Sequence, residues 1–332
     1  AKGKRKGKKK IIFIHTHIVE FTKRFIEFID IKDTAANGIV NSVPGDPVVI
    51  NRDSAKGYVS YGGAIVYVND LEGKITKINL TDLFEPNLKL YDHYTLFDVK
   101  STSSDGRLMY HSMDTAIGKD TKQLWLFAGT GDYNNLTDTT TVGGNVLIGI
   151  ADEKFPEFKT PVDVQNFNSG ATMVPPTIDN LAKCLDTTKN TVLAPGVNCP
   201  KKMPAGIPSK KGWVIYLDNH KKVTASPTVS GGIAYFPVFS PPITGDKCKN
   251  GAATICAIDD ECGTNASSLL GTHAKSDKCL YVGEGILSKI VTYGGKIYAN
   301  IAGKSASGSD LIEKDSIGME VDITRGTWKE NF

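Results

Sequence analysis

The segment YVSYGGAIVYVNDLEGKITKINL, from Tyr58 to Leu80, indicates the fold class. Gly62 and Gly63 precede the apolar run AIVYV, and the polar stretch NDLEGK leads into a second run, KITKINL. Adjacent glycines supply the positive φ angles of a tight hairpin turn at little steric cost, and β-branched and aromatic residues favour strands. The segment therefore predicts strands joined by short turns.

The same pattern recurs along the chain. Further Gly-Gly pairs stand at 143–144, 231–232 and 294–295, and each precedes an apolar run, namely NVLIGI, IAYFPVF and KIYANIA. The repeated units span 124–150, 212–239 and 279–302. Irregular repetition with about 40–50 residues per unit is typical of β-propellers, in which stacked blades cover faces that one small sheet cannot bury alone.

We therefore expect an all-β fold with very little helix. The predicted architecture is a β-propeller of six to seven four-stranded blades over residues 38–332, with long loop insertions that carry disulfides. An open sandwich is the alternative fold. The hydrophobic fraction of 40% suffices for a core. No stretch approaches the roughly 20 apolar residues of a membrane-spanning helix.

Residues 1–37 differ from the rest and are treated as a separate basic segment. The run AKGKRKGKKK favours a solvated, flexible end over an anion-binding arm or a signal peptide, and we expect it to belong to a longer product. Phe21, Phe25 and Phe28 are spaced as on one face of a short amphipathic helix over 21–31, although these residues also suit a strand. The net charge of +3 gives the body no nucleic-acid signature.

All six cysteines lie in the second half of the chain, without C-x-x-C pairs, which argues against zinc and favours disulfides in an oxidising compartment. Buried free thiols in a cytosolic protein are the alternative. Two loop-like insertions, 155–209 and 243–278, hold most of them. We expect Cys184 to pair with Cys199, because both lie in the first insertion. The remaining four are expected to pair locally, with the three possible arrangements left open: Cys248, Cys256, Cys262 and Cys279.

Motifs of catalysis are missing from the sequence, which contains no G-x-S-x-G, H-E-x-x-H or P-loop. We therefore expect a protein that binds rather than catalyses. The sequence contains two acidic clusters, and neither matches the EF-hand pattern of a calcium loop. DYNNLTD offers weak metal candidates, namely Asp132, Asn134, Asn135 and Asp138. DDE at 259–261 and the pair His15 and His17 are interpreted as turn and surface residues.

Several segments, in the same order, resemble the C-terminal propellers of the PilY/PilC proteins of type IV pili. GIVNSVPGDPVV at 38–49 resembles GDIVNSSPVVV, and VYVNDLEGKITKINL at 66–80 resembles VYAGDLxGNLWRFDL. LFAGTGDY, GWVIYLD, VTASPTVSGGIAYFPVF, TICAID and TRGTWKE resemble further family segments. The resemblance implies a protein exported through the periplasm to the pilus tip or outer cell surface. There it would contact minor pilins and a host or surface receptor, and support pilus extension, adhesion and twitching motility.

The resemblance also implies a calcium loop of the form D-x-D-x-D-G-x-x-D before Asp70. The corresponding window, Lys56 to Ala64, reads KGYVSYGGA and contains no carboxylate. Calcium needs six to eight oxygen ligands. We therefore expect no calcium site there, and no other cofactor is assigned. Two rival functions stay open: a quinoprotein dehydrogenase, disfavoured because the chain has only three tryptophans for a Trp motif in every blade, and a generic scaffold propeller.

Overall fold

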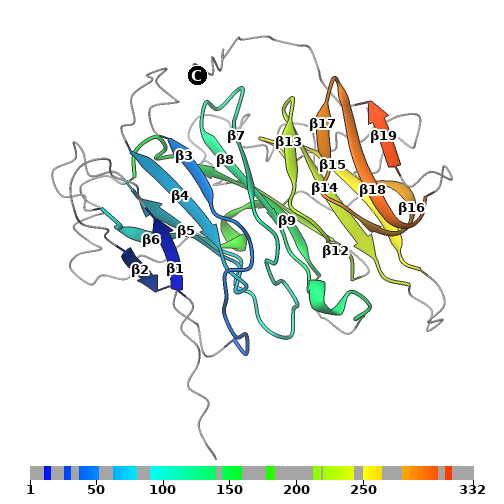
Figure 1. Cartoon of the computed structure of the whole chain (residues 1–332), viewed down its shortest axis with the longest axis horizontal. Coiled ribbons are helices and arrows are strands. Elements are labelled where there is room, and N and C mark those ends of the chain that lie inside the picture. Colours follow the sequence, from blue (N-terminus) through cyan, green and yellow to red (C-terminus); the bar gives the residue numbers. More distant parts are fainter. Residues whose placement is uncertain are drawn as a thin grey trace, which may run out of the picture.

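The computed structural model describes residues 11–15, 26–30, 37–51, 63–80, 90–139, 144–158, 177–183, 212–217, 220–242, 250–263, 279–305 and 311–315. These residues form three sheets and a two-stranded ribbon, which are drawn in Figure 1. The helical elements among them are two short 3-10 turns, η2 (Tyr133–Asn135) and η3 (Ile178–Asn180). The all-β prediction is confirmed.

The first sheet is an antiparallel meander in chain order: β3 (Val48–Asn51), β4 (Ala64–Asn69), β5 (Lys74–Asn79) and β6 (His93–Asp98). Its central hairpin, β4–β5, is the one that the sequence around Gly73 predicts. In the register Ile65 faces Asn79 and Asn69 faces Ile75.

The second sheet has the order β10-β11-β9-β8-β7. Four of its strands, in the order β7-β8-β9-β11, form a meander like that of the first sheet. Strands β7, β8, β9 and β11 pair antiparallel, whereas the short β10 pairs with β11 in parallel. The strands are β7 (Asp114–Ile117), β8 (Leu124–Gly129), β9 (Val146–Asp152), β10 (Ala182–Lys183) and β11 (Gly212–Tyr216).

The third sheet has the order β12-β14-β15-β16-β18-β17, with β13 paired to β14 and β19 paired to β18. Its strands are β12 (Lys222–Val223), β13 (Thr228–Ser230), β14 (Ile233–Ser240), β15 (Ala252–Asp259), β16 (Cys279–Leu287), β17 (Val291–Tyr293), β18 (Lys296–Ser305) and β19 (Leu311–Asp315). Gly231–Gly232 and Gly294–Gly295 close the β13–β14 and β17–β18 hairpins with φ between 57° and 81°. These are the primed turns that the Gly-Gly pairs predict.

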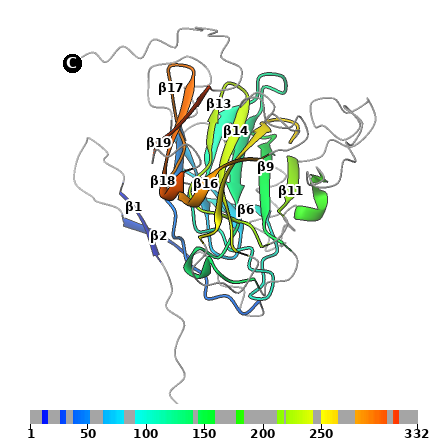
Figure 2. The ribbon, with the colours of Figure 1, turned by 90° about the vertical axis from the view of Figure 1, so that its right-hand side faces the viewer.

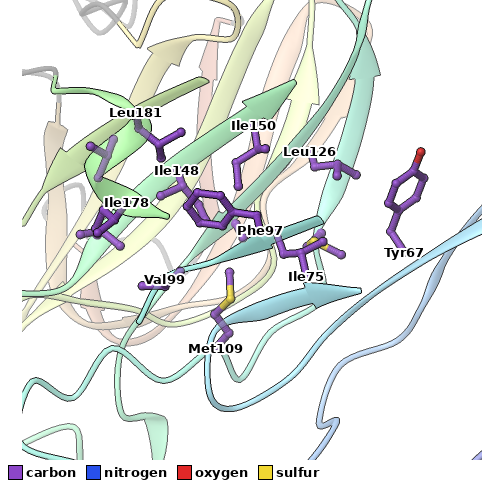
Figure 3. Packing of buried hydrophobic residues seen from close by; sticks show 14 of the residues in the cluster. Tyr67, Ile75, Phe97, Val99, Met109, Leu126, Ile148, Ile150, Ile178 and Leu181 are labelled. Atoms are coloured by element: carbon purple, nitrogen blue, oxygen red, sulfur yellow. The ribbon is translucent and has the colours of Figure 1, made fainter. Parts of the chain in front are cut away.

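Alternation of the side chains along β8, in the second sheet, explains how the three sheets stack. On β8, Leu126 belongs to a core cluster shared with the first sheet, whereas Trp125 and Phe127 belong to one shared with the third. Because successive strand residues point to opposite faces, both faces of this sheet are covered. Figure 3 shows Ile75 and Phe97 of the first sheet gathered with Leu126, Ile148 and Ile150 of the second. Figure 2 views the molecule from the side of the third sheet, with β16 and β18 towards the viewer.

Two features differ from the sequence-based predictions. For 21–31, where a helix and a strand were both open, the described part is a strand and the helix is wrong, because β2 (Ile26–Asp30) pairs antiparallel with β1 (Ile11–His15). The predicted insertion 243–278 contains β15, a central strand of the third sheet. Small residues hide this strand: Ala252, Ala253 and Cys256 give it little apolar bulk, and Gly251 leaves room for the Phe239 ring.

Candidate functional site

The segment Asp132–Asp138, called here the 132–138 loop, connects β8 towards β9 and carries the predicted metal candidates. Asp132 begins the 3-10 turn η2, and its Oδ1 accepts a hydrogen bond from the backbone N–H of Asn134 at 3.0 Å. A short side-chain carboxylate is well suited to this capping position. The Asn134 side-chain amide donates to the Tyr110 hydroxyl at 2.9 Å. Both side chains thus have hydrogen bonds within the chain.

Lys222 of β12 reaches into the same loop. Its Nζ donates to the carbonyl oxygens of Leu136, at 3.1 Å, and Asp138, at 2.6 Å. Burial lowers the pKa of Lys222, while the nearby charges of Asp138 and Asp132 act in the opposite direction. An ammonium group therefore lies against backbone oxygens of the kind that a hard cation uses as ligands.

The outer face of the 132–138 loop combines aromatic, amide and hydroxyl groups. The Tyr133 side chain is 41% exposed, and Asn134, Asn135 and Thr137 are exposed beside it. The ring of His111 meets that of Tyr133 edge to face, with centroids 5.0 Å apart. Burial lowers the pKa of His111. Such a surface can hydrogen-bond and stack against a polar partner.

Metal binding at the 132–138 loop stays a prediction. Among the residues that the structure describes, no group of three or more His, Cys, Asp and Glu side chains is placed to hold a metal ion. In the other acidic cluster, Glu261 accepts the backbone N–H groups of Asp120 and Thr121 at 2.8 and 2.7 Å. Asp259 Oδ1 accepts the N–H of Cys262 at 2.8 Å. Glu261 therefore joins a turn of the third sheet to the β7–β8 connection, whereas Asp259 shapes the turn itself.

Lys222 should stabilise the 132–138 loop. The variant Lys222→Met keeps most of the apolar stem but removes the ammonium group that donates to the carbonyls of Leu136 and Asp138, which should cost about 1–3 kcal/mol. Chemical denaturation of the purified chain measures this loss. The control is the same substitution at the adjacent, half-buried Lys221, for which we expect little change. Equal losses in both variants would contradict the role given to Lys222.

Asp70, the reference point for the expected calcium loop, lies in the β4–β5 turn and is buried. Its carboxylate accepts the Asn41 side-chain amide at 2.9 Å and the Lys74 backbone N–H at 2.9 Å. Glu72 is buried beside it and forms an ion pair with Lys74. Asp70 therefore shapes the hairpin. The expected absence of calcium before it stays a prediction, since most of Lys56–Ala64 lies outside the described residues.

Burial raises the pKa of Asp70 to about 6, and the nearby Glu72 acts in the same direction. An acid whose folded-state pKa is raised favours folding at low pH and loses that contribution as the pH rises through the folded value. Stability from Asp70 should therefore fall between about pH 4 and pH 6, by at most about 3 kcal/mol. Asp70→Asn, which keeps an acceptor for Lys74, should lack this fall. Urea unfolding of both proteins from pH 4 to 7 tests it, and parallel curves would refute it.

A buried polar triad was missed by the sequence analysis. Lys77 of β5 and Asp152 at the end of β9 are 0% and 1% exposed, and Nζ lies 2.6 Å from Oδ2. The Tyr67 hydroxyl donates to the same Oδ2 at 2.6 Å. The pair joins the first sheet to the second. The only available signal was a lysine within the apolar strand KITKIN, at a position that normally faces solvent or a partner.

The structure resolves part of the disulfide question. Cys256 of β15 and Cys279 of β16 stand directly opposite each other and are bonded, which confirms a local pair within the last four cysteines. Cys262 is also disulfide-bonded. Cys184, Cys199 and Cys248 lie outside the described residues, so the Cys184–Cys199 pairing stays a prediction. His15 is the last residue of β1, and His17 lies outside the described residues.

Comparison with known proteins finds a likeness in structure but not in sequence. No protein-family model matches the chain, and no curated protein matches its sequence. Among solved structures, the crystal structure of the Pseudomonas aeruginosa PilY1 C-terminal domain superposes with a TM-score of 0.54 and 13% sequence identity, over 86% of this chain. This chain spans 63% of the length of that chain. The described residues include no helix suited to crossing a membrane. The chain therefore has a fold similar to that of the PilY1 C-terminal domain.

Proposed function

We propose that this chain is a non-catalytic, type IV pilus-associated protein, which works at the pilus tip or outer cell surface. The observation that carries the proposal is the likeness to the PilY1 C-terminal domain over 86% of the chain. The ordered motifs from GIVNSVPGDPVV to TRGTWKE support it independently, because they were recognised in the sequence alone. Its function would be to support pilus assembly and extension, adhesion and twitching motility, through minor pilins and a surface receptor.

The sheet arrangement supports a propeller. The first sheet, the strands β7-β8-β9-β11 and the strands β13-β14-β15-β16 are successive four-stranded antiparallel meanders, and β17-β18-β19 starts another. Their faces stack on one another through shared core clusters, as blades do. These are the meanders that the described residues form. The count of six to seven blades stays part of the proposal. A solution-scattering envelope of the chain distinguishes a closed disc from an open sandwich.

The disulfides support an extracytoplasmic location. The Cys256–Cys279 bond lies between two central strands, and Cys262 is oxidised as well. Stable disulfides are typical of secreted and cell-surface proteins and rare in the reducing cytosol. Export through the periplasm would supply the oxidising conditions in which these bonds form.

The proposal is tested by deleting the gene in its native cell and counting surface pili by electron microscopy. We expect few pili in the deletion strain and recovery when the retraction motor is also removed, because the protein would favour extension over retraction. Complementation with the unaltered chain should restore pili. Unchanged pilus number, adhesion and twitching in the deletion strain would refute the proposal. An absorbance scan that finds a bound quinone would instead favour the quinoprotein alternative.

The 132–138 loop offers two variants for the same assay, with a third variant elsewhere as their control. Tyr133→Ala and Asn135→Ala remove exposed groups from its outer face, whereas Tyr293→Ala removes a tyrosine that is 78% exposed on β17. If the loop contacts a partner, the first two variants should reduce adhesion while the control does not. Equal adhesion of all three would exclude the loop from the proposed binding surface.

A further inference from the structure

Lys77 and Asp152 lie in a setting that favours a covalent bond between them. Both side chains are excluded from water, and Lys77 Nζ lies 2.6 Å from Asp152 Oδ2. The rings of Phe158 and Tyr67 enclose the nitrogen, with centroids at 5.7 and 5.9 Å. The Glu157 carbonyl accepts a further hydrogen bond from Nζ at 2.8 Å. The amine is thus held beside the carboxyl group by contacts on several sides.

The two carboxylate oxygens of Asp152 have different partners. Oδ1 accepts the backbone N–H of Lys154 at 3.0 Å. Oδ2 accepts the Tyr67 hydroxyl at 2.6 Å, besides its contact with Lys77. Burial raises the pKa of Tyr67, and the neighbouring Asp152 raises it further, so the hydroxyl keeps its proton and acts as a donor. One oxygen is therefore placed as a carbonyl oxygen and the other as a leaving group.

We propose that Lys77 and Asp152 condense to an amide cross-link, an isopeptide bond, between β5 and β9. One proton first passes from the ammonium to Oδ2, which leaves a neutral amine and a neutral carboxylic acid. Nζ then attacks Cγ and forms the new C–N bond, while negative charge develops on Oδ1 against the Lys154 N–H. The C–Oδ2 bond breaks, and Oδ2 leaves as water with a second proton from Nζ, assisted by the Tyr67 hydroxyl.

Burial favours this reaction over a persistent ion pair. Removing two charges from water is costly, and the first proton transfer eliminates both charges. Because folding already holds the reacting groups together, the reaction avoids the loss of entropy that a bimolecular condensation would suffer. The product would tie the first sheet to the second covalently, at the interface drawn in Figure 3, where Tyr67 is labelled. This inference does not depend on the proposed pilus function.

The test is the intact mass of the purified full chain after complete reduction and alkylation of its cysteines. We expect a mass lower than that of the sequence by one water molecule, and a digest peptide that joins the Lys77 and Asp152 segments. The variant Lys77→Met should have its full sequence mass. A matched control, Lys74→Met, removes the lysine of a partly exposed ion pair in the same sheet and should still lose the water.

Wild-type protein that is folded, incubated to constant mass and still carries its full sequence mass would overturn the inference without need of any variant. Tyr67→Phe tests the role of the hydroxyl, since it keeps the ring and removes only the donor. Cross-link formation in this variant should be slower by roughly 100-fold. An unchanged rate would refute the role assigned to Tyr67.

Discussion

Replacing Lys77 with methionine should lower the free energy of unfolding by about 3–5 kcal/mol, the usual cost of breaking a buried ion pair. The substitution leaves the Asp152 carboxylate, 1% exposed, without its positive partner in a site that water does not reach. The Tyr67 hydroxyl and the Lys154 N–H satisfy its oxygens only in part. Loss of the proposed cross-link would add to this effect. Urea unfolding, followed by the fluorescence of buried Trp125 and Trp213, measures it.

A second substitution separates charge from packing. In the double variant Lys77→Met with Asp152→Asn, no uncompensated charge remains, so the part of the loss that comes from the unpaired carboxylate should return, whereas the part that comes from the cross-link should not. The control is Lys100→Met, because Lys100 is 58% exposed and its pair with Asp98 should contribute at most about 1 kcal/mol. A double variant as unstable as Lys77→Met alone would show that the charge of Asp152 is not the cause.

Trp213→Ala should cost about 3–5 kcal/mol, as expected for removal of a large buried aromatic side chain. Trp213 of β11 is fully buried and packs against Phe127 and Phe236, with ring centroids 6.3 Å away in each case. Its indole N–H donates to the Asp260 carbonyl at 2.7 Å, so it joins the second sheet to the third. The variant opens a cavity and removes the indole N–H that donates to the Asp260 carbonyl. Thermal and urea unfolding measure the loss.

The fit around Trp213 can be tested from the opposite side. A Cβ atom at Gly149 of β9 would lie 2.4 Å from the Trp213 ring, so Gly149→Ala should cost about 1–3 kcal/mol by overpacking. The exposed Tyr293 supplies the control, because Tyr293→Ala should change stability by about 0.5 kcal/mol or less. A Trp213→Ala variant as stable as this control would contradict the packing described.

The hairpins were predictable because their determinants are local. Gly231–Gly232 and Gly294–Gly295 adopt positive φ angles that few other residues tolerate, and the flanking β-branched and aromatic residues favour strands. The motif around Gly73 similarly contains the whole β4–β5 turn. The family resemblance, which the structural likeness supports at the level of fold, rests on the same local segments.

The ribbon β1–β2 was not predictable in this way, and β15 was indicated by the resemblance of TICAID to a family strand rather than by such local determinants. The apolar bulk around β15 is supplied by its neighbours, since Gly251 makes room for the ring of Phe239. For β2, the spacing of the phenylalanines fits a helix equally well, and pairing with β1 decides the matter. In both cases the information lies in a strand distant in sequence.

The sequence by itself determined the all-β class, the positions of the turns and the acidic residues of the 132–138 loop, because backbone preference and residue type act over a few neighbours. Only the tertiary structure decided which charges meet. Lys222 reaches the 132–138 loop, and Lys77 reaches Asp152, from strands that are far away in the chain. Such contacts form because stacking of the sheets brings polar groups that are distant in sequence together and removes water from them, and no local pattern encodes that stacking.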